Sequence, residues 1–477
     1  MLKNDGLLPI RKDLRSVAVI GPAADTVSYG DYTETRGRKG GVSVLDGIRA
    51  AVSPETEVLY ERGCNFLGQA LHPFDPSMLR DENGESGLTG HYYNGPVPQG
   101  EPVQVRTDRT VNFNWIFALP HPALDANCFS VVWTGSVVMP RTMDGCIGLS
   151  TQDSMRLYVD DKLLIDGWGK DKSADQALDF HFEAGRTYKI RIEFVNDRRG
   201  ARVIFGYSAG WENFPAAVEA ARKADVAILC MGDNEETSGE NFDRTDLNLP
   251  GRQLELVQAV YATGTPVVLV LQSGRPVTAN WENDHLPAIL EAWFPGEQGG
   301  TAIAKTLFGD AAPGGRLPIT FPRSVGQIPC HYSRRPGGGK RYVEMDWLPL
   351  YPFGYGLTYT TFAYRDMALS RSVIDPQDTV TVSVTVTNTG KYTGDAVPQL
   401  YVRDMFSSVV KPERQLAAFR RLTLAPGESR RVELTVGPKQ LRTLGPDYVW
   451  RVEPGKFELQ LGDNAENILL RADLTVE

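Results

Sequence analysis

The chain has 477 residues, 42% of them hydrophobic, and a formal net charge of -9 at pH 7. This length allows about three domains of roughly 150 residues each, all with real hydrophobic cores. The negative charge argues against nucleic acid or an anionic membrane surface as a partner, because both require clustered positive charge. A neutral ligand such as a sugar fits this charge better.

No stretch approaches the roughly 20 apolar residues that a membrane span requires. The six histidines are dispersed, and the five cysteines lack close pairing, so we expect neither a disulfide framework nor a metal or other cofactor. The first residues lack the apolar run of a secretion signal, which slightly favours a cytoplasmic location and otherwise leaves localisation open.

Short apolar strands alternate with helical periods in two separate parts of the chain. The strands are expected at 17–20, 57–60, 226–230 and 267–271, and the helices near 42–49, 216–224 and 252–262. This alternation predicts a parallel sheet covered by helices. We therefore expect one discontinuous α/β sandwich domain made of residues 1–78 and 212–335.

The segment that interrupts this domain, residues 79–211, is all β by pattern. Short runs of Val, Ile, Tyr and Phe are separated by Gly and Asp-Gly turns, which is typical of a β-sandwich. Its aromatic residues are candidates for stacking on sugar rings, although many such residues in a sandwich belong to the core (Tyr92, Tyr93, Trp115 and Trp168).

An acidic loop follows the expected strand at 226–230. Residues 232–244 read Gly-Asp-Asn-Glu-Glu-Thr-Ser-Gly-Glu-Asn-Phe-Asp-Arg. In open α/β sheets, ligands bind at the carboxyl ends of the strands, and a Glu on such a loop is held by a rigid scaffold. This loop is therefore the best candidate for a functional site.

The last part of the chain, residues 349–477, returns to an alternating β pattern. Val380, Val382, Val384 and Val386 alternate with Thr and Ser, which predicts a half-buried antiparallel strand. The fold class expected overall is thus multidomain α/β plus all-β: an α/β sandwich, a β-sandwich insert, and a terminal β-sandwich.

Several motifs occur in one fixed order along the chain. They are Leu-Lys-Asn-Asp-Gly-Leu-Leu-Pro at 2–9, Gly-Asp-Ala-Ala-Pro-Gly-Gly-Arg-Leu-Pro-Ile-Thr-Phe-Pro at 309–322, and Tyr-Pro-Phe-Gly-Tyr-Gly-Leu-Thr-Tyr at 351–359. With the acidic loop, they resemble the part of family 3 glycoside hydrolases, the β-glucosidase family, that follows the catalytic barrel. The resemblance covers nearly the whole chain and implies that residues 349–477 form a fibronectin type III-like domain.

The insert resembles a protective-antigen-type β-sandwich through sequence motifs such as Gly-Leu-Thr-Gly-His-Tyr-Tyr at 87–93. In some family 3 enzymes, such a module is inserted at this point and leans over the mouth of the active site. The resemblance therefore places Asp153 and Ser154 close to the substrate. The paired aspartates of the calcium-binding relatives are missing here, so no metal is expected, and a simple turn role for Asp153 is the alternative.

The family resemblance also assigns chemistry to the acidic loop. A retaining glycosidase needs a carboxylic acid that protonates the departing oxygen and a carboxylate nucleophile. By this resemblance, the motif Ser-Gly-Glu-Asn-Phe-Asp-Arg at 238–244 implies that Glu240 is the acid/base and that Asp243 and Arg244 support the loop. Asn241 stands where Gly is common, but Asn tolerates a left-handed backbone. Glu236 is the second candidate for the acid/base, because Glu-Thr-Ser-Gly at 236–239 also matches a motif of the family. Two further alternatives are that Glu235 is the acid/base and that the loop is only a solvated acidic turn.

The nucleophile of the family lies in a Ser-Asp-Trp context that this sequence lacks. The one Asp-Trp pair, Asp346-Trp347, falls in the connector before residue 351 and is not expected to be catalytic. We therefore expect a chain cut or split at a domain boundary, which needs a family 3 barrel in cis or trans.

The expected substrates are β-glucosides or short β-linked oligosaccharides with terminal non-reducing β-D-glucosyl residues, and a homodimer is a further expected partner state. A carbohydrate-binding or assembly protein without a barrel is the alternative, and the sequence does not separate glucosides from xylosides.

Overall fold

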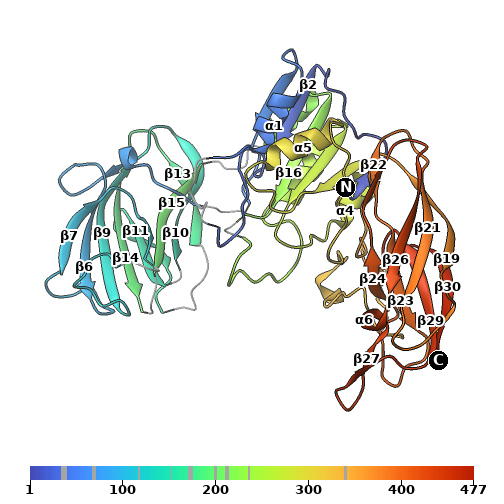
Figure 1. Cartoon of the computed structure of the whole chain (residues 1–477). Helices are drawn as coiled ribbons and strands as arrows, with labels where there is room; N and C mark the ends of the chain where they lie inside the picture. The colour runs from blue at the N-terminus through green and yellow to red at the C-terminus, as the bar shows by residue number, and fades with distance from the viewer. Residues whose placement is uncertain are drawn as a thin grey trace. The chain divides into compact units, whose positions relative to one another are not determined.

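The computed structural model describes residues 1–33, 40–66, 71–115, 119–151, 153–169, 176–197, 201–209, 214–234, 237–337 and 341–477. The chain forms two compact units, residues 1–66 with 214–477 and residues 67–213, and each is described by itself (Figure 1). Among the described residues, no helix is both long enough and apolar enough to cross a membrane.

A six-stranded sheet, in the order β1-β18-β17-β16-β2-β3, forms the centre of the α/β part of the first unit. Its strands are β1 (Lys3–Asn4), β2 (Ser16–Ile20), β3 (Glu57–Glu61), β16 (Val226–Gly232), β17 (Val267–Gln272) and β18 (Ala288–Glu291). All pair in parallel except β1, which runs antiparallel to β18. Every residue of β2, β16 and β17 is buried, as expected for strands covered on both faces.

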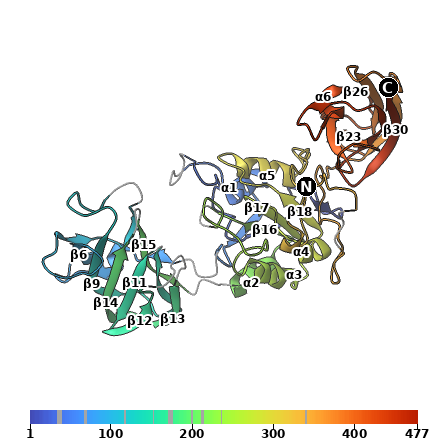
Figure 2. The same cartoon turned by 90° about the horizontal axis from the view of Figure 1, so that it is seen from below.

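Helices lie on both faces of this sheet (Figure 2). One face carries α1 (Val44–Ala51) and α5 (Gly299–Leu307), and the other carries α2 (Phe214–Lys223), α3 (Gln253–Tyr261) and α4 (Asn280–His285). Successive residues of β16 alternate between the two cores, since Ile228 packs with α1 and α5 while Leu229 packs with α2 and α3. The expected α/β domain with a parallel sheet is thus confirmed.

The second unit contains two antiparallel sheets of five and seven strands. Its elements are β4 (His72–Pro73), η1 (Pro76–Met78), β5 (Leu79–Arg80), β6 (Leu88–Asn94), β7 (Gln104–Asp108), β8 (Asn112–Asn114), β9 (Phe129–Val138), β10 (Met143–Thr151), β11 (Ser154–Val159), β12 (Lys162–Asp166), β13 (Gln176–Phe182), β14 (Thr187–Asn196) and β15 (Arg202–Ala209). Tyr92 and Trp115, two of the candidate sugar-stacking residues, are 0% and 9% exposed and belong to the aromatic core. The protective-antigen-type assignment stays a prediction.

The C-terminal part of the first unit is a β-rich domain with its own core. Its elements are β19 (Phe362–Leu369), β20 (Val373–Ile374), β21 (Val380–Asn388), β22 (Gly394–Ala396), β23 (Gln399–Asp404), β24 (Gln415–Phe419), β25 (Leu422–Leu424), β26 (Ser429–Val436), α6 (Pro438–Leu441), β27 (Thr443–Leu444), β28 (Trp450–Arg451), β29 (Gly455–Gly462) and β30 (Ile468–Val476). The four alternating valines of β21 are each 0% exposed. The strand predicted from that alternation is confirmed. A short helix, η2 (Val325–Gln327), lies in the connector before this domain.

Candidate active site

The acidic loop starts where β16 ends at the carboxyl edge of the sheet. The buried side chain of Gln253 bonds both backbone groups of Gly232: its Oε1 accepts from the Gly232 N–H at 2.7 Å, and its Nε2 donates to the Gly232 carbonyl at 2.8 Å. A Cβ on Gly232 would lie 1.9 Å from the Gln272 carbonyl oxygen, so only glycine fits beside β17. The base of the loop is therefore fixed by the sheet.

Asp233, the first residue of the loop, is a buried carboxylate with two cations around it. It is 2% exposed, and its Oδ1 accepts from Thr237 Oγ1 at 3.2 Å and from Arg244 Nη1 at 3.1 Å. Arg275, which follows β17, places Nε 4.0 Å from Oδ2. Burial raises the pKa of the Asp233 carboxyl, and the charges of Arg244 and Arg275 oppose this rise. The cluster ties the two ends of the loop together.

Glu240 lies at the exposed tip of the loop. Its backbone N–H donates to Asp31 Oδ2 at 3.2 Å. Asn241 follows with φ +64°, the left-handed conformation that its residue type was expected to tolerate. The tip thus combines an exposed glutamate side chain with a main chain that is hydrogen-bonded to Asp31.

The remaining residues predicted in this loop differ in their surroundings. Arg244 donates from Nη2 to the Asn248 carbonyl at 2.8 Å in addition to its bond with Asp233. Asp243 is exposed, and its side chain makes no hydrogen bond or ion pair within the described part of the chain. Glu235 and Glu236 lie outside the described residues.

Arg275 lies beside this loop and was not predicted from the sequence. Its Nη2 donates to Ser238 Oγ at 3.2 Å and to the Phe242 carbonyl at 3.3 Å, on either side of Glu240. The available signal was its place in Ser-Gly-Arg directly after the buried strand β17. Since all parallel strands of a sheet end at one edge, that place brings Arg275 to the acidic loop.

Glycines allow an aromatic ring to lie close against these loops. A Cβ on Gly30 would come within 3.0 Å of the Phe294 ring, and a Cβ on Gly274 would lie 2.9 Å from the same ring and 2.5 Å from Ser238 Oγ. Phe294 follows β18, so the loops after β2, β17 and β18 meet at this ring. Their backbones can approach it only because these two positions lack side chains.

A groove of about 780 Å³ opens beside these residues. Asp31, Ser238, Arg275 and Phe294 line it from the strand ends, and residues 328–331 line it from the connector. This volume lies within the range of roughly 300–1,000 Å³ typical of small-molecule sites. Within the described residues, no cluster of three or more His, Cys, Asp or Glu is placed to hold a metal ion.

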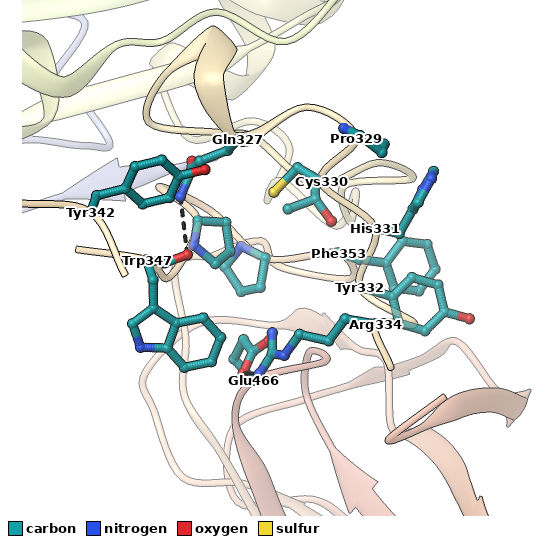
Figure 3. A pocket seen from close by; sticks show the side chains of 13 residues that line it. Gln327, Pro329, Cys330, His331, Tyr332, Arg334, Tyr342, Trp347, Phe353 and Glu466 are labelled. Carbon is teal, nitrogen blue, oxygen red and sulfur yellow. Dashed lines mark hydrogen bonds and ion pairs between the residues drawn. The ribbon is translucent and has the colours of Figure 1, made fainter. Parts of the chain in front are cut away.

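Residues 329–331 of this wall also line a second, smaller cavity of about 100 Å³ (Figure 3). Arg334 lies at its edge and reaches the C-terminal domain, where Nη1 contacts Glu466 at 2.7 Å and Nε contacts Glu413 at 3.2 Å. The guanidinium also lies 4.5 Å from the ring centroid of Trp347. Arg334 thereby bonds the connector to the C-terminal domain.

The other predicted residues lie elsewhere. Asp153 is 2% exposed, with its N–H bonded to Thr151 Oγ1 at 3.1 Å, and Ser154 begins β11. Both belong to the second unit, so their nearness to substrate stays a prediction. Asp346 is exposed, and its Oδ1 accepts from the Leu348 N–H at 3.1 Å in a local turn.

Two family models match this chain. The model for the Glycosyl hydrolase family 3 C-terminal domain matches residues 1–359, and that for the Fibronectin type III-like domain matches residues 396–465. The chain belongs to glycosyl hydrolase family 3, as a member carrying its C-terminal domain. The expected fibronectin type III-like domain is confirmed as well.

The relatives are longer proteins named as glycosidases. A β-glucosidase from Rhizobium radiobacter is 34% identical over 512 residues, which cover 100% of this chain and 61% of that protein. A β-xylosidase from Formosa agariphila is 45% identical over 302 residues, 61% of this chain and 42% of that protein. The crystal structure of a β-glucosidase from Kluyveromyces marxianus in complex with glucose matches with a TM-score of 0.74 and 28% identity, over 100% of this chain and 61% of that one. The chain thus spans about two fifths to three fifths of these relatives.

Proposed function

We propose that this chain supplies the acid/base half of a retaining family 3 β-glucosidase acting on terminal non-reducing β-D-glucosyl residues. A catalytic barrel, on the same or a second polypeptide, would supply the Asp nucleophile. Two facts support this proposal: the chain matches 61% of the Rhizobium β-glucosidase, and its 477 residues contain no Ser-Asp-Trp. The observation that carries the proposal is the exposed Glu240 on a loop held at its base and at its tip.

Glu240 would perform two proton transfers. As an acid, it donates a proton to the glycosidic oxygen while the barrel carboxylate attacks the anomeric carbon. As a base, it then removes a proton from the water that hydrolyses the glycosyl-enzyme. The exposed tip suits both transfers, since the leaving group and the water must each reach the same carboxyl.

The second unit is part of the same proposal. We take it to be a protective-antigen-type module, with Asp153 and Ser154 near the bound sugar. The two-sheet architecture and the position of the module between two parts of the α/β sequence support this assignment. The domain limits proposed are 1–78 with 212–335, 79–211 and 349–477.

The test is hydrolysis of 4-nitrophenyl β-D-glucoside by the chain alone and mixed with a separately expressed family 3 barrel. Activity is expected only in the mixture, and Glu240→Gln is expected to lower it about 10²–10⁴-fold. Glu55→Gln, at an exposed surface position, is the matched control and should keep full activity. Activity retained in Glu240→Gln but lost in Glu236→Gln would move the acid/base role to Glu236.

Two alternatives are separated by the same assay. The Formosa relative is named a β-xylosidase, so 4-nitrophenyl β-D-xyloside belongs in every measurement, and a higher kcat/KM on it would assign xyloside specificity. Sugar binding without hydrolysis in any mixture would instead favour a carbohydrate-binding protein.

A further inference from the structure

We propose that Asp31 is a positioning residue for the acid/base, holding the main chain of Glu240 next to Gly239, which lines the groove, so that the Glu240 carboxyl meets the departing oxygen. This inference rests on the proposed function, because it needs Glu240 to be the proton donor. Asp31 lies on the loop after β2 and is separated from Glu240 by 209 positions in the sequence.

The contact between the two loops is close and specific. Asp31 Oδ2 accepts the Glu240 N–H at 3.2 Å. The same carboxylate lies against the bare Cα of Gly239, where a Cβ would be 2.7 Å from Oδ2 and 3.0 Å from Cγ. Gly239 is therefore the residue that lets the carboxylate reach the neighbouring N–H.

The tip is fixed on its other side as well. The Phe242 N–H donates to the Gly239 carbonyl at 3.3 Å, across the left-handed Asn241. Glu240 thus lies between an external acceptor and an internal turn. An ionised acceptor makes a stronger bond to a backbone N–H than a neutral one does.

The loop that carries Asp31 is itself anchored. The Gly296 N–H donates to the buried Ser28 carbonyl at 3.0 Å, and Tyr29 Oη donates to the Gly40 carbonyl at 3.0 Å. Gly30, with φ +86°, approaches the Phe294 ring. The position of Glu240 therefore depends on the loops after β2, β16 and β18 together, and a shift of about 1 Å at a reacting group lowers a rate about 10²-fold.

The chemistry of the leaving group separates positioning from general stability. The leaving group of 2,4-dinitrophenyl glucoside is good enough to depart without protonation. The leaving group of phenyl glucoside needs the proton that the acid supplies. A misplaced acid must therefore slow the hydrolysis of phenyl glucoside far more than the hydrolysis of dinitrophenyl glucoside. Simple unfolding would lower both rates by the same factor.

The experiment measures kcat/KM for both substrates with the chain assembled on its barrel. Asp31→Ala is expected to lower the value for phenyl glucoside about 10–100-fold and that for dinitrophenyl glucoside less than about threefold. Asp31→Asn, which keeps an acceptor oxygen, should recover most of the loss. Asp13→Ala, an exposed aspartate whose ion pair with Arg11 lies at the surface, is the matched control.

Equal losses on both substrates, or no loss on either, would overturn the positioning role of Asp31. Glu240→Gln is measured beside it and should show the same selective loss, more strongly. If Glu240→Gln shows no dependence on the leaving group, the proposed function itself fails, whatever Asp31→Ala does. Thermal unfolding of each variant shows whether the protein still folds.

Discussion

Arg244 Nη1 donates to Asp233 Oδ1 at 3.1 Å, and the two side chains are only 17% and 2% exposed. The pair joins the first residue of the acidic loop to a residue beyond its tip, so the segment that carries Glu240 is closed at its base. Removing one partner of a buried ion pair leaves the other without compensation, which is more costly than losing a surface pair.

We expect Arg244→Ala to lower the free energy of unfolding by about 2–3 kcal/mol, because Asp233 then loses its nearest cation. Thermal or urea unfolding measures this change. Arg11→Ala is the control, since its partner Asp13 is exposed, and it should cost less than about 1 kcal/mol. Equal effects of the two substitutions would show that the Arg244–Asp233 pair does not stabilise the loop.

Gly239→Ala should reproduce the effect of losing Asp31. The added Cβ would stand 2.7 Å from Asp31 Oδ2, so the two groups must separate and the bond to the Glu240 N–H must lengthen. We expect kcat/KM for phenyl glucoside to fall about 10-fold or more. In the double variant with Asp31→Ala, the losses should not add, whereas Gly315→Ala, which meets nothing within 4 Å, should be neutral for this rate. Additive losses would place Gly239 and Asp31 in separate roles.

Stability should depend on the protonation of Glu282 on α4. This residue is 3% exposed, and burial raises the pKa of its carboxyl to about 7 from the ordinary 4.5. Between these values the folded chain keeps a proton that the unfolded chain has released, so the free energy of unfolding falls as pH rises from 4.5 to 7. Glu282→Gln should remove up to about 3 kcal/mol of that fall, measured as unfolding free energy at about pH 4.5 and about pH 8. Identical pH slopes in both proteins would contradict this role.

The attachment of the C-terminal domain should depend on Arg334. Its side chain is 22% exposed and contacts Glu413, Glu466 and the face of Trp347. Arg334→Ala should lower unfolding stability by about 2 kcal/mol. Arg334→Lys should recover less than half of this loss. An ammonium group does not reproduce the paired contacts of Nη1 and Nη2 with the two Glu466 oxygens, at 2.7 and 3.3 Å, or the stacking of the guanidinium on Trp347. Full recovery by Lys would show that charge alone suffices.

The strands that could be predicted from the sequence are those whose burial is encoded in a local hydrophobic pattern. The runs at 226–230 and 267–271, and the alternating valines of β21, correspond to observed strands because burial on two faces or on one face leaves a local signature. The four-residue strand β18 was not predicted, since it is short and depends on pairing with β17 and β1. A strand of that length has too little pattern of its own.

The candidate site was predictable only in part for the same reason. The acidic loop and Glu240 were predicted from their sequence motif and from their place after a buried strand. Asp31 and Arg275 reach that loop through contacts across 209 and 37 positions. Contacts over such separations are made by the sheet, which brings the strand ends together, and no local periodicity encodes them.

Azide rescue of the assembled enzyme carrying Glu240→Ala, with 2,4-dinitrophenyl β-D-glucoside as substrate, tests the acid/base role most directly. Without the acid/base carboxylate, water is poorly activated, and azide can attack the glycosyl-enzyme in its place. We predict that azide raises turnover at least about tenfold and that β-glucosyl azide is the product. Rescue by azide in Glu236→Ala, and none in Glu240→Ala, would contradict the assignment of Glu240.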